Sequence, residues 1–94
     1  NLPVILTGDF NLEDNNPIIK NIQKYLTDVQ FNIDKSNKYY GTFTGFKHSK
    51  IIEKRIDYIF VKNIKVNQSK HVHLKTPTNG WASDHHPVLT TLKF

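Results

Sequence analysis

The segment RIDYIFV, at residues 55–61, constrains the fold of this 94-residue chain more than any other part of the sequence. Most of its side chains are β-branched or aromatic, and such residues favour a β-strand that packs against a core. One acid, Asp57, interrupts the apolar run, and a carboxylate is costly to bury unless it is paired. Two interpretations follow: Asp57 is buried and paired, or alternation places it on a face that solvent reaches.

The other segments predict a single α/β domain over residues 1–94. The continuous apolar run at residues 3–7 predicts a strand that is buried on both faces. A helix is predicted from Pro17 to residue 26, because proline suits a first turn and Asn15 or Asn16 can cap it. Further extended segments are predicted at residues 42–46, 64–74 and 88–94. One main helix among several strands indicates a mixed layer, in which one sheet face is short of cover.

Charge and cysteine content narrow the range of functions. The chain carries 13 basic and 8 acidic residues, and the net charge of +5 weakly favours a polyanionic partner. It contains no cysteine, which excludes disulfides and zinc sites built on thiolates. No apolar run approaches the roughly 20 residues that a membrane-spanning helix needs. Because the chain enters a strand at once and contains no methionine, we interpret it as a piece of a longer protein.

Polar side chains stand beside three of the predicted strands. Asp9 and Asn11 are two residues apart, so an extended backbone would point both the same way. An Asx turn that closes the strand is the alternative for this pair. Asp57 lies within the central strand, and Asp84 and His85 precede the last one, where a polar turn is the alternative.

Together these groups predict a metal-assisted site at one edge of the layer. Carboxylate and amide oxygens suit a hard divalent cation, and a histidine beside an acid forms an acid–base pair. Oxygen ligands without cysteine favour Mg²⁺ or Mn²⁺ over structural zinc. Such a site suits the hydrolysis of phosphate esters, which requires a positioned water and neutralised charge on the phosphoryl group.

Three motifs, GDFN, RIDYIF and SDHHPV, resemble in this order the last three motifs of the endonuclease/exonuclease/phosphatase superfamily. This superfamily includes deoxyribonuclease-like nucleases, abasic-site endonucleases, inositol polyphosphate phosphatases, sphingomyelinases and deadenylases. The intervening GTFTGF is similar to the Thr-Phe segment that lines the substrate cleft in many members. The resemblance extends from Val4 to Leu92. It implies the C-terminal half of a four-layer α/β sandwich with a mixed, mainly antiparallel sheet. The upstream half would supply an asparagine and the main metal-binding glutamate.

The resemblance also implies a role for each polar group. Asp9 would activate the attacking water as general base, and Asn11 would hydrogen-bond the phosphate or that water. Asp57 would hold one nitrogen of His85. His85, as imidazolium, would stabilise negative charge on the scissile phosphate. Asp84 would be a ligand of Mg²⁺ or Mn²⁺, and Ser83 would position Asp84. Thr42 and Phe43 would border the substrate, and Trp81 would either border it as well or pack beneath the loop.

Metal-dependent hydrolysis of a phosphate ester by a longer parent protein is therefore the leading functional hypothesis. The expected partners are the missing N-terminal half and a substrate such as nucleic acid, an inositol phosphate or a phospholipid headgroup. The chain alone is expected to bind metal poorly and to be inactive. A non-catalytic binding or scaffold domain with the same fold is the alternative. A third interpretation is an unrelated zinc domain built on His71, His73 and the tandem histidines.

The other polar residues are expected to be ordinary surface or packing residues. His86 should point away from His85 if the backbone is extended there. Neither Glu13 nor Glu53 is expected to replace the missing glutamate. Solvent-exposed positions are expected for His48, His71, His73 and the basic cluster of Lys47, Lys50, Lys54 and Arg55, with phosphate contact as the alternative for His48 and for the cluster. Tyr39 and Tyr40 are expected to pack, with stacking on a base or ring as the alternative.

Overall fold

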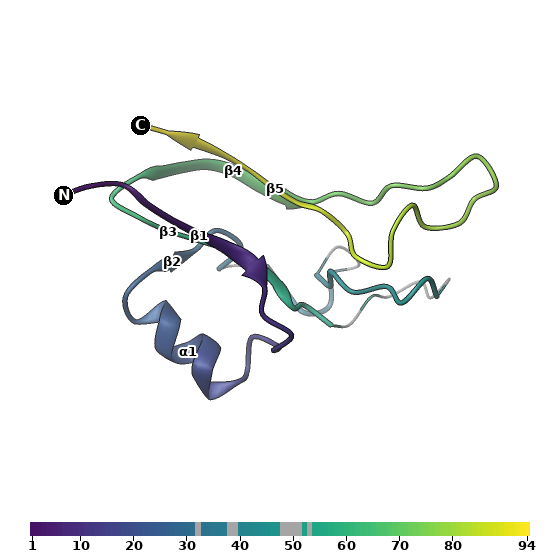
Figure 1. The fold of residues 1–94 in the computed structure, drawn as a ribbon, viewed down its shortest axis with the longest axis horizontal. Coiled ribbons are helices and arrows are strands. Elements are labelled where there is room, and N and C mark those ends of the chain that lie inside the picture. The colour runs from purple at the N-terminus through teal and green to yellow at the C-terminus, as the bar shows by residue number, and fades with distance from the viewer. Residues whose placement is uncertain (32, 38–39, 48–51, 53) are drawn as a thin grey trace.

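A computed structural model of the chain describes residues 1–31, 33–37, 40–47, 52 and 54–94 (Figure 1). The α/β class is confirmed, since one helix accompanies strands whose described pairings are all antiparallel. The elements in chain order are β1 (Val4–Asp9), α1 (Pro17–Gln23), β2 (Thr27–Asp28), β3 (Asp57–Lys62), β4 (Lys65–His71) and β5 (Val88–Lys93).

A three-stranded sheet forms the centre of the molecule, with β3 between β1 and β2. Its core is made by Tyr58 and Phe60 of β3, which are buried together with Ile19 of α1. In Figure 1, α1 lies beneath β1, β2 and β3. Residues two apart in a strand share a face. Tyr58 and Phe60 face the helix, so Asp57, one position before Tyr58, lies on the opposite face of the sheet.

The helix begins as predicted and ends earlier than predicted. Asn16 is the N-cap, and its side chain accepts a hydrogen bond from the backbone N–H of Ile18, while Pro17 occupies the first turn. The helix ends at Gln23 rather than at residue 26. Because Thr27 pairs with Val61 of β3, the chain must leave the helical path before it reaches the sheet.

The first strand is not buried, so the prediction for residues 3–7 is wrong. Every residue of β1 is exposed, and Ile5 and Leu6 retain 48% and 38% of their accessible surface. β1 is an edge strand of the sheet. Its continuous apolar run is suited to burial, but no described segment covers it. The sheet surface predicted to be short of cover therefore lies at β1.

A second, two-stranded sheet pairs β4 with β5 and contains an irregularity between Val66 and Gln68. In Figure 1 these strands run side by side above the first sheet, and the loop between them extends away from the end where both termini lie. The segment predicted to be extended at residues 42–46 forms β-bridges at Phe43, to Lys54 and to His85. No described helix is both long and apolar enough to cross a membrane.

Candidate active site

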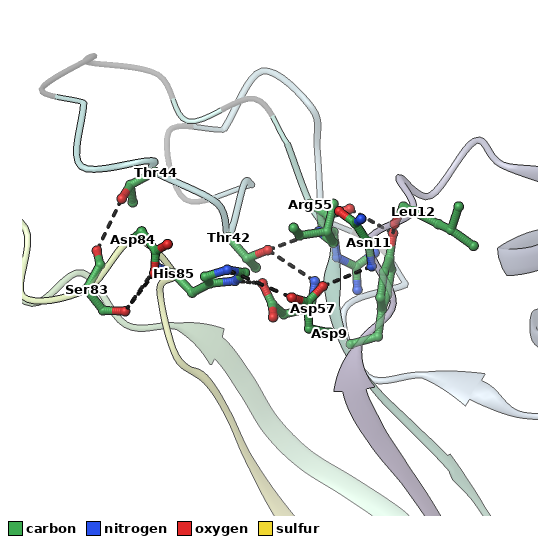
Figure 2. A network of polar contacts seen from close by, with 12 residues as sticks. Asp9, Asn11, Leu12, Thr42, Thr44, Arg55, Asp57, Ser83, Asp84 and His85 are labelled. Carbon is green, nitrogen blue, oxygen red and sulfur yellow. Dashed lines mark hydrogen bonds and ion pairs between the residues drawn. The ribbon is translucent and has the colours of Figure 1, made fainter.

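The register of the central sheet places two carboxylates opposite each other. Asp9, the last residue of β1, pairs with Asp57, the first residue of β3. Like charges opposite each other in a sheet repel, but here an imidazole lies between them (Figure 2). Nδ1 of His85 is 2.8 Å from Oδ2 of Asp57, and its Nε2 is 3.9 Å from Oδ2 of Asp9. The three side chains thus form an acid–histidine–acid group.

The electrostatics of this group favour the charged form of its histidine. The hydrogen bond to Asp57 raises the pKa of His85 above its ordinary value, although partial burial of the ring acts in the opposite direction. The negative charges of Asp57, Asp84 and Asp9 raise it further. Asp57 is therefore paired, as the first of the two sequence interpretations held, and it is suited to hold the imidazolium in place.

Replacement of Asp57 by asparagine is expected to lower the pKa of His85 toward the ordinary value of 6.5. The isosteric amide removes the charge that stabilises the imidazolium. NMR titration of the ring protons measures this pKa, and His86 in the same spectra is the internal control. In the native protein, the pair stabilises the fold fully below the unfolded-state pKa and loses this contribution as pH rises through the folded-state pKa. An unchanged His85 titration would contradict the pairing.

The GDFN segment closes β1 with an Asx turn. The backbone N–H of Asn11 donates to Oδ1 of Asp9 at 2.9 Å, and Asn11 adopts a φ of 55°. Asparagine is among the residues that tolerate this left-handed region. Of the two interpretations of this pair, the Asx turn is therefore the one that the structure has, and the extended backbone through Asn11 is not. Both side chains nevertheless line one cavity of about 480 Å³, together with His85 and Phe43.

Thr42 is a buried residue that joins the two halves of the site. Its side chain is 0% exposed, and its hydroxyl oxygen accepts hydrogen bonds from the backbone N–H groups of Ile56 and Asp57. Its carbonyl accepts from the N–H of His86 at 2.6 Å. The expected position of Thr42 at the border of the substrate is wrong, because no part of this side chain reaches solvent. It instead connects the start of β3 to the segment that carries His85.

Phe43 lines the cavity at Asp9, and its role at the border of the substrate stays a prediction. Its ring meets the ring of His85 edge-on, with centroids 5.1 Å apart. This contact restricts the movement of the imidazole.

Ser83 and Asp84 shape the loop before His85. The carbonyl of Asp84 accepts from the N–H of Thr44 at 2.7 Å, and the hydroxyl of Ser83 accepts from the N–H of His85 at 3.1 Å. Oγ of Ser83 is also 3.5 Å from Oδ1 of Asp84 (Figure 2). These contacts fix the backbone of the loop and leave the Asp84 carboxylate partly exposed.

Among the described residues, Asp9, Asp57 and His85 each place one possible ligand atom within 4.8 Å of the others. The carboxylate oxygens suit Mg²⁺ or Mn²⁺, which prefer oxygen ligands, whereas the imidazole, whose pKa is raised by the hydrogen bond to Asp57, cannot bind a cation while it is protonated. The two carboxylates fall short of a complete coordination sphere, so further ligands are required. Among the described residues Asp84 is not part of this group, and its role as a metal ligand stays a prediction.

His86 belongs to a buried aromatic cluster rather than to the site. It is 3% exposed, and its ring stacks on that of His73 with centroids 4.0 Å apart. Burial, with the nearby His73 and His71, lowers the pKa of His86 to about 4. The ring is therefore neutral at pH 7 and, as predicted, lies away from the partners of His85.

Trp81 completes this cluster. Its indole N–H donates to the carbonyl of Lys47 at 2.7 Å, and its ring meets that of His86 with centroids 4.6 Å apart. Trp81 does not line the cavity at Asp9, and its placement matches the packing alternative. The expectation that His71 lies on the surface is wrong, because only 4% of it is exposed. His73 is half-buried.

The predicted basic cluster is divided by the fold. Arg55 is 2% exposed, forms an ion pair with Asp28 and lies 4.7 Å from the ring centroid of Tyr58, so a solvated position is wrong for it. Lys54 is exposed and lines the cavity at His85. Tyr40 is buried, as expected. The expectations for Tyr39, His48, Lys50 and Glu53 fall outside the described residues.

The fold and the site together define an α/β protein with an acid–histidine–acid group at the ends of its strands. The chain belongs to the endonuclease/exonuclease/phosphatase family, which matches residues 1–85. Among curated proteins, none matches the chain.

Two solved structures are similar to this chain. A mannosyl-6-phosphatase from Bacteroides thetaiotaomicron VPI-5482 shares 31% identity, with a TM-score of 0.78 over 100% of this chain and 39% of that one. A functionally unknown conserved protein from Enterococcus faecalis V583 shares 27% identity, with a TM-score of 0.77 over 97% of this chain and 36% of that one. The chain thus spans less than two-fifths of either protein.

Proposed function

We propose that this chain is the C-terminal part of a catalytic domain that hydrolyses phosphate esters with the help of Mg²⁺ or Mn²⁺. The observation that carries the proposal is the position of His85 between Asp57 and Asp9. Membership of the endonuclease/exonuclease/phosphatase family and the likeness to a mannosyl-6-phosphatase support a phosphoesterase. Because the matched structures are more than twice as long, the active unit is proposed to be a longer protein that contains this chain.

Each residue of the site has a distinct task in this reaction. Asp9 accepts a proton as the water oxygen bonds to phosphorus, and the bond from phosphorus to the alcohol oxygen breaks. Asn11 donates a hydrogen bond from its side-chain amide to a phosphate oxygen. His85, held by Asp57, donates from Nε2 to a non-bridging oxygen and stabilises the charge that develops there. The departing alcohol takes a proton from solvent.

The divalent cation would neutralise negative charge on the phosphoryl group. Asp84 and acids from the rest of the protein are proposed to hold it. Asp57 is committed to His85 by the 2.8 Å hydrogen bond, so it is better suited to orient the imidazole than to bind metal. Since the structural neighbour is named as a phosphatase, we propose a phosphate monoester as the substrate.

Removal of metal from the full-length protein tests this function. We expect a chelator to lower the hydrolysis of p-nitrophenyl phosphate at least 100-fold, because the cation supplies several kcal/mol of charge stabilisation. Added Mg²⁺ or Mn²⁺ should restore the activity, and bis-p-nitrophenyl phosphate, a diester, should be hydrolysed more slowly. The isolated 94-residue chain is the matched control and should be inactive. Hydrolysis that survives complete chelation, or no hydrolysis of either ester, would contradict the proposal.

A further inference from the structure

The cavity beside the acid–histidine–acid group is lined by a row of three side chains. Phe43 forms antiparallel bridges to Lys54 on one side and to His85 on the other. Residues directly opposite in a ladder point to the same face, and neighbouring segments lie about 4.8 Å apart. Consistent with this geometry, Lys54, Phe43 and His85 all line the same cavity. Lys54 therefore lies about two strand spacings, or ~10 Å, from the histidine that meets the phosphate.

Outside the acid–histidine–acid group, this cavity carries one positive and one negative side chain, those of Lys54 and Glu13. Asn15 also lines it. Glu13 and Lys54 are both exposed, and in the described part of the chain neither forms an ion pair. The ammonium, the carboxylate and the amide offer hydrogen-bond donors and acceptors in nearly equal measure. The charges of Lys54 and Glu13 offset each other.

The charges of the cavity point to the chemistry of the substrate. His85 is suited to the phosphoryl group. A second phosphate in the same cavity would be repelled by the carboxylate of Glu13, whereas hydroxyl groups can accept from Lys54 and donate to Glu13. Phe43, which is bridged to both His85 and Lys54, offers an apolar surface for the carbon atoms of the substrate. The volume of about 480 Å³ lies within the range of small-molecule sites.

We propose that this cavity binds, at Lys54 and Glu13, an uncharged, polyhydroxylated alcohol, such as a sugar, as the leaving group of the phosphate ester. Lys54 and Glu13 are then the residues that determine specificity. This inference rests on the proposed function, because it assigns the alcohol half of a substrate whose phosphate half binds at His85. Lys54 is suited to substitution, since the hydrogen bonds that hold it in place are made by its carbonyl, to the N–H groups of Thr42 and Phe43.

The test compares two monoesters that share a phosphate and differ in hydroxyl groups: a hexose 6-phosphate and phenyl phosphate. In the full-length protein, Lys54→Met and Glu13→Gln should each lower kcat/KM for the hexose 6-phosphate about 10-fold, mainly through KM, as loss of one charge-assisted hydrogen bond predicts. Hydrolysis of phenyl phosphate should change less than about twofold. Lys65→Met, the same change at an exposed lysine of β4, is the control and should leave both substrates unaffected.

The outcomes separate this inference from the function on which it rests. Equal losses for both monoesters in Lys54→Met would place Lys54 at the phosphoryl group and overturn the inference alone. A preference for a hexose bisphosphate or a short oligonucleotide over the hexose 6-phosphate would also overturn it. If the full-length protein hydrolyses no phosphate ester, the proposed function fails and the inference fails with it.

Discussion

Replacement of His85 by alanine is expected to lower kcat of the full-length protein about 100- to 10,000-fold, the range typical for a residue that exchanges or shares a proton with the reacting group. The change removes the donor to the phosphate oxygen. It also leaves the carboxylates of Asp9 and Asp57 facing each other across the strand pair without a cation between them. Steady-state hydrolysis of a phosphate monoester measures the loss, and a fall of less than about 10-fold would contradict the role of His85.

The neighbouring histidine provides the comparison. His86→Ala should preserve turnover per folded molecule, because His86 contacts His73 and Trp81 rather than the carboxylates. The burial of His86 adds a cost in stability. Loss of a side chain that is 3% exposed should lower the free energy of unfolding by about 2 kcal/mol. Urea denaturation measures that free energy and corrects the activity for the folded fraction.

The second large effect is expected for Asp9→Asn, which should lower kcat about 100- to 10,000-fold. The amide keeps an oxygen that can accept from the N–H of Asn11, so the Asx turn at the end of β1 is retained. What it loses is the ability to take a proton from water and the charge next to Nε2 of His85. A loss in kcat with a nearly unchanged KM would show that the carboxylate acts in the transition state.

A matched control for Asp9→Asn exists elsewhere in the chain. Asp34 accepts a hydrogen bond from the N–H of Ser36 at 2.8 Å, which is the same Asx arrangement as that between Asp9 and Asn11. Asp34→Asn therefore makes the same chemical change in the same local geometry, outside the cavity at His85. If both variants lose activity equally, a general effect on folding rather than proton transfer explains the result, and the assignment of Asp9 is contradicted.

Local patterns in the sequence were sufficient to predict most of the fold. The strand at residues 55–61, the helix that begins at Pro17 and the final strand were all predicted from residue type and spacing. The pairing of Asp57 was one of two open interpretations, because an acid inside an apolar run needs a partner. Each of these features depends on residues close together in the chain, where periodicity and capping are informative.

Contacts between distant segments could not be predicted in this way. Arg55 is buried against Asp28, 27 residues earlier, and no local pattern distinguishes it from the exposed Lys54 beside it. The hydroxyl of Thr42 is buried against the start of β3 for the same reason. The position of Lys54 at the cavity of His85 depends on which segments pair through Phe43. Side-by-side pairing of segments is fixed by tertiary packing, which the sequence of one segment does not contain.

The register between β1 and β3 has a consequence for how this sequence can change over time. Asp9 faces Asp57 only because each residue from Val4 onward has one fixed partner in β3. A slip of one position turns every side chain of a strand to the opposite face. Replacement of one exposed apolar residue of β1 by another therefore leaves the site intact. Insertion or deletion of a single residue in β1 would instead exchange Asp9 for a neighbour with no acid–base chemistry, so the length of this strand is under stronger constraint than its composition.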